Sequence, residues 1–181
     1  MQNERTLQTE IRFTGNVIQV EVLEVCLPDG RVGRREIVRH GGGAAIVAID
    51  GLGRVVLVRQ YRKAVEMEML EIPAGKLEPG EDPAACASRE LREETGYHAV
   101  QVIPLTSILP TPGYCSEVLH LFFASQLTAG ESHPDEGEYV ETVLLPIEEC
   151  LDMIGDGRIR DAKTVAGILL AARKAECRGA D

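Results

Sequence analysis

Four charged residues crowd into a short predicted helix and form the clearest chemical signal in this sequence. They are Arg89, Glu90, Glu93 and Glu94. Because Glu90 and Glu94 are four positions apart, their carboxylates repel each other along one helix face. Arg89 stands four positions before Glu93 and can pair with it, which offsets part of this repulsion. The remaining negative charge suits a hard divalent ion such as Mg²⁺, which takes carboxylate, water and phosphate oxygens as ligands.

The helix that must carry these side chains has clear start and stop signals. Asp82-Pro83 supplies an N-cap and a proline in the first turn, and Gly96 suits the left-handed position after the last turn. Its small and apolar side chains share one face, which we expect to press against a sheet. These residues are Ala84, Ala87, Ser88, Leu91 and Thr95.

A solvent-exposed acidic helix face is the alternative interpretation of these carboxylates. The preceding loop, residues 73–80, reads PAGKLEPG and contains two glycines and two prolines. A loop of this kind lets backbone carbonyls approach a bound ion closely. The combination of loop and helix favours a metal site over a solvated surface.

The spacing of this region resembles the signature of the Nudix hydrolases. Gly75 is followed after five residues by Glu81, and after seven more by the run RELREETGY of residues 89–97. Every fixed position is occupied, and only Tyr97 departs slightly, where an aliphatic residue is commoner. The resemblance implies an α/β fold, the Nudix-type α/β/α sandwich with a mixed sheet, across about residues 40–177. It also implies diphosphate hydrolysis with Mg²⁺, or with Mn²⁺ or Zn²⁺ as substitutes.

A second set of features resembles one branch of that family, the ADP-ribose pyrophosphatases. Pro112 lies 16 residues after Gly96, within the loop LPTPGYCSE of residues 109–117. The segment VRQYR, residues 58–62, and the N-terminal strands are also similar to that branch. The resemblance implies hydrolysis of ADP-ribose, or of related ADP-sugars, to AMP and ribose 5-phosphate.

The resemblance also assigns metal ligands. Glu90, Glu94 and the backbone carbonyl of Ala74 would hold the metal ions. Glu93 would be a further ligand or would act through a bridging water. Glu138, in the acidic loop 131–141, would be an additional ligand, and a solvated turn is the alternative for this residue.

The expected catalytic residues are Glu136, Glu93 and Arg89. Residues 135–139, DEGEY, resemble the DExE pattern of the branch, which makes Glu136 the residue that orients or deprotonates the attacking water. For Glu136, too, a mobile acidic turn is the alternative. Arg89 would direct the carboxylate of Glu93.

Four residues are expected to contact the substrate. By the same resemblance, Arg62 and Glu117 would face the terminal ribose and phosphate. Pro112 belongs to the loop typical of the branch. Tyr114, like Tyr61, is a candidate for stacking on adenine, although packing in the core is the commoner role of a tyrosine.

Two other functions compete with this interpretation. Another nucleotide sugar or a dinucleotide, such as GDP-mannose, ADP-glucose or NADH, would require the same diphosphate chemistry. A catalytically silent ADP-ribose sensor would normally carry a DNA-binding segment or lack signature glutamates. We find no basic patch or helix-turn-helix in the sequence, and all signature glutamates are present.

Composition narrows the class of protein. The 181 residues carry a formal net charge of −10, which argues against nucleic acid as a partner. No apolar run is long enough to span a membrane, and the N-terminus MQNERTLQTE lacks the apolar core of a signal peptide. We therefore expect a cytoplasmic protein without a membrane partner. The five scattered cysteines form no CxxC pair and indicate neither zinc nor disulfides.

The pattern along the chain predicts two regions. Alternation in residues 9–25, the turn signal LPDG at 27–30 and a return strand at 31–39 indicate a small antiparallel sheet, which is marginal alone. We therefore expect an N-terminal β-sheet region at residues 1–40 and a catalytic domain at residues 41–181. The family resemblance implies a homodimer through the N-terminal sheet, and folding back onto its own domain is the alternative.

Further elements are expected in the second region. They are a hairpin at 44–49 and 54–62, strands at 69–72, 98–105, 118–124 and 139–145, and helices at 146–153 and 162–175.

Overall fold

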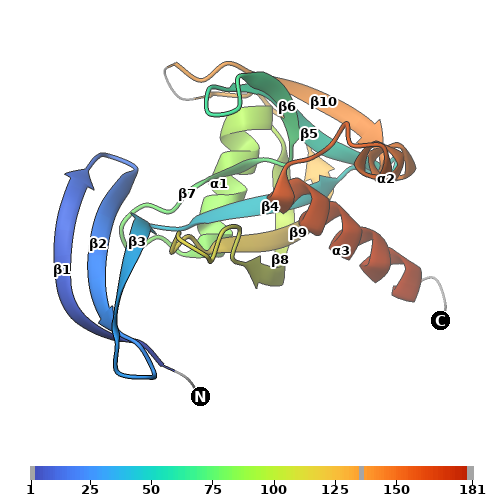
Figure 1. Cartoon of the computed structure of the whole chain (residues 1–181). Helices are drawn as coiled ribbons and strands as arrows, with labels where there is room; N and C mark the ends of the chain where they lie inside the picture. Colours follow the sequence, from blue (N-terminus) through green and yellow to red (C-terminus); the bar gives the residue numbers. More distant parts are fainter. Residues whose placement is uncertain (1–2, 135–136, 179–181) are drawn as a thin grey trace. The chain divides into compact units, whose positions relative to one another are not determined.

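The computed structural model describes residues 3–134 and 137–178 of the chain. Its elements in chain order are β1 (Arg5–Thr14), β2 (Ile18–Cys26), β3 (Val32–His40), β4 (Gly43–Ile49), β5 (Arg54–Arg62), β6 (Met67–Glu71), β7 (Ala74–Lys76), α1 (Pro83–Thr95), β8 (His98–Ile108), β9 (Leu119–Thr128), β10 (Val140–Pro146), α2 (Ile147–Gly155) and α3 (Ala162–Arg178) (Figure 1). The contacts divide the chain into two compact units. Unit 1 contains residues 1–42 and 109–118, and unit 2 contains the remaining residues.

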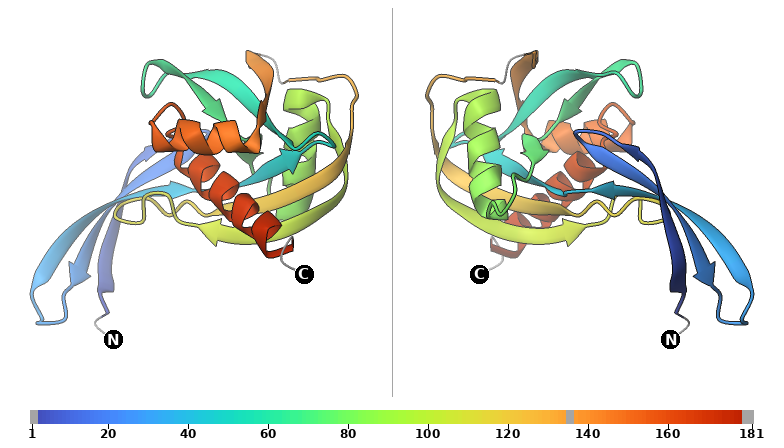
Figure 2. Two further views of the ribbon diagram at one scale, coloured as in Figure 1. Left: turned by 90° about the vertical axis from the view of Figure 1, so that its right-hand side faces the viewer. Right: turned by 90° about the vertical axis from the view of Figure 1, so that its left-hand side faces the viewer.

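Unit 1 is built on the expected three-stranded sheet. β1, β2 and β3 pair in that order and are antiparallel (Figure 2). The turn between β2 and β3 closes at Gly30, whose φ of 84° a glycine adopts without steric cost. Every residue of β1 is exposed, whereas Leu23 and Val25 of β2 are buried. The small sheet therefore leaves one whole strand without cover inside this unit.

The loop 109–118 packs on β3 within unit 1. Val38 donates its N–H to the carbonyl of Tyr114 at 2.7 Å, and Ser116 N–H donates to Val38 O at 2.9 Å. His40 N–H donates to the hydroxyl of Ser116 at 3.1 Å. The sequence had placed this loop in the region 41–181, but its strand-like hydrogen bonds group it with the N-terminal strands. The division into functional domains stays a prediction.

Unit 2 contains a mixed sheet. Its central path runs β10-β5-β4-β9-β8, with β6 paired to β5 and β7 paired to β4. The β4–β9 pair is parallel, and the other pairs in this sheet are antiparallel. β4 occupies the centre because its run GAAIVAI is buried on both faces.

Helices cover both faces of this sheet. Ala44, Ile46 and Ala48 of β4 pack in a core with Cys86, Ala87 and Leu91 of α1. The alternate residues Ala45 and Val47 pack in a second core with α2 and α3. Figure 2 shows α1 and α3 on opposite sides of the sheet. The structure thus confirms the predicted α/β/α sandwich with its additional small antiparallel sheet.

The structure corrects the sequence prediction in two places. Residues 73–80 are expected to form a loop, but Ala74–Lys76 forms β7 against Gly43–Ala45 of β4. The buried face of α1 also includes Cys86 and Glu94, whereas Ala84 and Ser88 are only partly buried. A glutamate is tolerated there because a backbone N–H reaches its carboxylate. Among the described helices, none is long and apolar enough to cross a membrane.

Candidate metal and active site

Helix α1 begins and ends where the sequence predicts. The carboxylate of Asp82 accepts hydrogen bonds from Ala84 N–H at 3.0 Å and Ala85 N–H at 3.1 Å, which caps the first turn. Gly96 has a φ of 75° and donates its N–H to Arg92 O at 2.8 Å. A side chain at Gly96 would also collide with the carbonyl of Gly130. These contacts fix the last turn, which carries Glu93 and Glu94.

Arg89 holds three carboxylates at once. Its Nη1 donates to Glu90 Oε1 at 2.7 Å and to Glu93 Oε2 at 3.0 Å, while Nε and Nη2 form a fork on Glu81 at 2.9 and 3.1 Å. Hydrogen bonding to Glu81 is the main cause that raises the pKa of Arg89. The same bond lowers the pKa of Glu81 to about 2. The predicted Arg89–Glu93 pair is confirmed, and its network extends to Glu90 and Glu81, both signature positions.

Glu94 is the most deeply buried of the signature carboxylates. It is 5% exposed, and its Oε2 accepts a hydrogen bond from Ala74 N–H at 3.2 Å. Burial, together with the negative charges of Glu90 and Glu138, raises its pKa to about 8. Burial likewise raises the pKa of Glu90. At Glu90, burial and the neighbouring negative charges thus outweigh the opposing effect of Arg89.

Gly75 allows the backbone of β7 to approach Glu90 closely. A Cβ atom at Gly75 would lie 1.8 Å from Glu90 Oε1. A side chain at this position would displace the Glu90 carboxylate, whereas glycine lets the strand lie next to it. The glycine that opens the signature is thus explained by contact with the glutamate fifteen positions later.

The first part of the acidic loop is hydrogen-bonded to the last turn of α1. His133 N–H donates to the carbonyl of Glu93 at 2.9 Å. Glu138 lies near enough for its charge to raise the pKa values of Glu90 and Glu94, after the larger effect of burial. Glu136, the expected base, lies outside the described residues, so that its role stays a prediction.

The donor set fits a hard divalent cation. Glu90, Glu94 and Glu138 would supply oxygen ligands, and a cation among them would oppose the effects that raise the pKa values of Glu90 and Glu94. In the part of the chain that the structure describes, no three acidic, His or Cys side chains are already arranged around one point as a metal site. Arg89 engages Glu90 and Glu93, and Ala74 N–H engages Glu94, so these side chains would turn toward an ion. The metal assignments stay predictions.

The expected substrate residues are divided between the two units. Arg62 belongs to unit 2, where its Nε and Nη2 form a fork on Glu71 at 2.7 and 2.8 Å. Glu117, Pro112 and Tyr114 belong to unit 1. The carboxylate of Glu117 lies 3.6 Å from His40 Nδ1, and the side chain of Tyr114 is exposed. Their substrate contacts stay predictions.

A buried charged cluster that the sequence does not predict lies beside Arg62. It consists of Glu71, Lys163, Asp161 and Thr164. Glu71 is 2% exposed and Lys163 is 8% exposed. The available signal in the sequence is an acidic residue, Glu71, at the buried end of β6. Burial opposes the ionisation of Glu71, but Arg62 and Lys163 outweigh it and lower its pKa to about 2.

Comparison with known proteins decides the family. A model of the NUDIX domain matches residues 39–167. The chain belongs to the Nudix family. The resemblance of the signature segment is thereby confirmed, and Ala74, Gly75, Glu90 and Glu94 all lie within the matched Nudix domain.

Curated relatives of this Nudix chain cover most of its length. The methanol dehydrogenase activator of Bacillus methanolicus is 45% identical over 167 residues, which are 91% of this chain and 90% of that protein. The ADP-ribose pyrophosphatase of Bacillus subtilis is 41% identical over the same shares of the two chains. The ADP-ribose pyrophosphatase of Mycobacterium tuberculosis is 33% identical over 91% of this chain and 81% of that protein.

A solved structure shares the fold of the Nudix chain. It is described as an ADP compounds hydrolase, with a TM-score of 0.87, and the match covers 99% of this chain and 97% of that one. Its sequence identity is 24%, so the likeness concerns the fold.

Proposed function

We propose that this Nudix protein hydrolyses the diphosphate bond of ADP-ribose, or of a related ADP-sugar, to AMP and ribose 5-phosphate. One observation carries the proposal: Arg89 gathers Glu90 and Glu93 beside the buried Glu94 on a fully occupied signature helix. The substrate is suggested by two relatives named ADP-ribose pyrophosphatase, each matching 91% of the chain.

The chemistry requires that negative phosphate oxygens be neutralised before water can attack. A divalent ion, which we propose to be Mg²⁺, supplies that neutralisation and lowers the pKa of a bound water. Glu90, Glu94, Glu138 and the carbonyl of Ala74 would hold the metal. Glu93 would hold it directly or through water.

The chain's own groups orient the reaction and move the proton. Arg89 fixes Glu90 and Glu93 through charge-assisted hydrogen bonds. Glu136 accepts a proton from the attacking water as the new oxygen–phosphorus bond forms and the bridging bond of the diphosphate breaks. Arg62 and Glu117 contact the terminal ribose phosphate, and Pro112 and Tyr114 shape the adenosine end.

The decisive experiment incubates the purified protein with ADP-ribose and Mg²⁺ and separates the products by ion-exchange chromatography. We expect AMP and ribose 5-phosphate in equal amounts. Absence of AMP with Mg²⁺, Mn²⁺ and Zn²⁺ would exclude the proposal, and tight ADP-ribose binding without turnover would point to a sensor. Comparing kcat/KM for ADP-ribose, ADP-glucose, GDP-mannose and NADH then orders the substrates.

A second candidate function follows from the 45% identical relative, which is named a methanol dehydrogenase activator. We infer that this chain could stimulate a dehydrogenase in the same way. The test adds the protein to a purified methanol dehydrogenase and follows the rate of methanol oxidation. Stimulation that persists with Glu94→Gln would indicate activation by binding, and stimulation that disappears would indicate that hydrolysis is required.

We further propose a homodimer formed through the N-terminal sheet. Leu7, Ile11 and Phe13 of β1 are 44%, 58% and 54% exposed, which leaves apolar side chains on the outer strand of a marginal sheet. Analytical ultracentrifugation should show two chains per particle, and Phe13→Asp should shift the equilibrium toward one chain. A wild-type monomer at micromolar concentration would exclude the dimer. A cytoplasmic location stays a prediction.

A further inference from the structure

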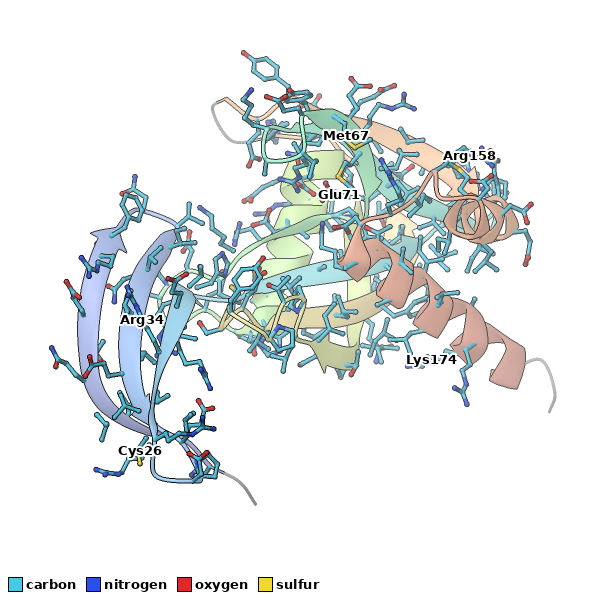
Figure 3. The ribbon with its side chains drawn as sticks, viewed as in Figure 1. Cys26, Arg34, Met67, Glu71, Arg158 and Lys174 are labelled. Atoms are coloured by element: carbon cyan, nitrogen blue, oxygen red, sulfur yellow. The ribbon has the colours of Figure 1, made fainter. Side chains whose placement is uncertain are left out.

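A buried ion-pair cluster links the start of α3 to the end of β6. Lys163 Nζ contacts Glu71 Oε2 and lies 3.0 Å from Asp161 Oδ2. On its other side, Glu71 accepts the fork from Arg62. Glu71 is therefore shared by two cations, one from β5 and one from α3. Figure 3 shows Glu71 close to the beginning of α3 and Lys174 toward its other end.

The local surroundings of Lys163 are unfavourable for a lysine. It is the second residue of α3, where the helix dipole is positive and a cation is repelled. It is also 8% exposed, and burying an ammonium group is costly unless it is paired. Its contacts with Glu71 and Asp161 offset both costs. The reason for this lysine therefore lies in its partners across the fold.

The cluster is connected to the signature region by the main chain. Thr164 Oγ1 accepts a hydrogen bond from Ile72 N–H at 2.9 Å and itself donates to Asp161 Oδ2 at 2.6 Å. Two residues after Ile72, Ala74 N–H donates to the carboxylate of Glu94. The start of α3 therefore anchors the short segment that leads from Glu71 to the metal-site backbone.

Arg62 is bound to this cluster through Glu71 and is close enough to Glu94 to be affected by its charge. Its hydrogen bonds to Glu71 raise its pKa, and the charges of Glu94 and Asp161 add to that rise. The fork on Glu71 uses Nε and Nη2, which leaves the Nη1 amino group outside the pair for an anionic ligand. The direction of Nη1 depends on the plane of the Glu71 carboxylate, and Lys163 restrains that plane from inside the fold.

We propose that Lys163, acting through Glu71, is a positioning residue that aims the Arg62 guanidinium at the phosphate of the substrate. The inference rests on the proposed function, in which Arg62 contacts the terminal ribose phosphate. Lys163 itself touches no substrate, because its ammonium is enclosed by Glu71 and Asp161. A purely stabilising ion pair is the competing explanation, and buried pairs of that kind are often replaceable by apolar residues without loss of stability.

The test is a double-mutant cycle on substrate affinity. Wild type, Lys163→Met, Arg62→Ala and the double variant are assayed with ADP-ribose at saturating Mg²⁺, below the melting temperature of each. We expect Lys163→Met to raise KM about tenfold while kcat changes less than about twofold, because uniform binding is lost. In the Arg62→Ala background the same substitution should have almost no effect on KM.

Two further variants keep the result interpretable. Lys163→Arg preserves the cation and should keep KM within about threefold of wild type. Lys174→Met, on the same helix but remote from Glu71, should leave KM unchanged. If Lys163→Met does not fold, Lys163→Gln replaces it in the cycle, and circular dichroism verifies folding of every variant.

The possible failures are distinguishable. If the wild type does not hydrolyse ADP-ribose, the proposed function fails, and the cycle is run with the substrate that the diphosphate panel identifies. If the wild type is active and Lys163→Met changes only the melting temperature, the positioning role is wrong. An equal KM effect of Lys163→Met with and without Arg62 would also overturn it, since Lys163 would then not act through Arg62.

Discussion

Gly75 and Glu90 are in such close contact that a Cβ atom on the glycine would lie 1.8 Å from Glu90 Oε1. Relieving the clash requires the Glu90 side chain to move, and with it the hydrogen bond that Arg89 donates to Glu90 Oε1 at 2.7 Å. We expect Gly75→Ala to displace the Glu90 carboxylate and to lower kcat by roughly a hundredfold, in the range lost when a reacting geometry moves by about 1 Å. Steady-state hydrolysis of ADP-ribose measures this.

The matched control for that substitution is Gly51→Ala. Gly51 has no atoms within 4 Å of its Cβ position, and its turn lies between β4 and β5 of the same unit. The kcat of Gly51→Ala should equal that of wild type. Normal activity in Gly75→Ala would show that the Glu90 position is unimportant.

Glu94→Gln should separate metal binding from folding. Burial raises the pKa of Glu94 to about 8, so the folded metal-free protein holds a proton there that the unfolded chain releases at neutral pH. Removing the charge should abolish Mg²⁺ binding and lower kcat by about a thousandfold or more. With EDTA at pH 7 the variant should be about 1–3 kcal/mol more stable than wild type.

Isothermal titration with Mg²⁺ and urea unfolding in EDTA measure the two effects of Glu94→Gln. Glu10→Gln, on the exposed strand β1, is the control that should change neither. A variant that binds Mg²⁺ like wild type would contradict the assignment of Glu94 as a ligand.

Arg89→Lys should test whether the geometry of the Arg89 hydrogen bonds matters, since lysine keeps the positive charge but lacks the forked guanidinium. A lysine cannot hold Glu81, Glu90 and Glu93 together as the guanidinium does. We expect kcat to fall by about 10- to 100-fold, with circular dichroism unchanged. Arg92 is exposed and lies about one helical turn after Arg89, and Arg92→Lys should have the kcat of wild type. Equal kinetics for both variants would show that the fork has no role.

The loss of folding stability at acid pH should depend on Glu71. Although burial opposes its ionisation, Arg62 and Lys163 lower its pKa from 4.5 to about 2. The unfolded chain therefore binds this proton first as pH falls, and the stability that Glu71 contributes is present above pH 4.5 and lost toward pH 2. The contribution at pH 7 is about 3 kcal/mol.

Urea unfolding at a series of pH values measures this dependence. The stability difference between wild type and Glu71→Gln should shrink steadily as pH falls through that window. Glu68→Gln, an exposed residue of the same strand, should run parallel to wild type. A constant difference for Glu71→Gln across the window would exclude the linkage.

Much of the fold and the signature helix could be predicted from local patterns. The capping by Asp82, the stop at Gly96 and the Arg89–Glu93 pair all depend on residues within a few positions of each other. The strands were recognised because alternation and turn residues also act over short distances. Strand β7 was missed since its three residues resemble a turn, and they become a strand only by pairing with β4.

The buried cluster could not be predicted for a similar reason. Glu71 and Lys163 are 92 positions apart, and neither sequence neighbourhood shows that the other will be there. A charged residue is expected to be solvent-exposed until the fold encloses it, so the sequence around Glu71 and Lys163 does not predict their pairing.

By itself, therefore, the order of residues determined which groups we expect to carry the chemistry, since helix spacing places Arg89 and its glutamates on one short segment. Only the tertiary structure decided how those groups are charged and aimed. Burial sets the proton affinity of Glu94, the missing side chain of Gly75 admits Glu90, and Lys163 reaches Glu71 across the fold. Dielectric environment and long-range contact arise only when distant segments pack together.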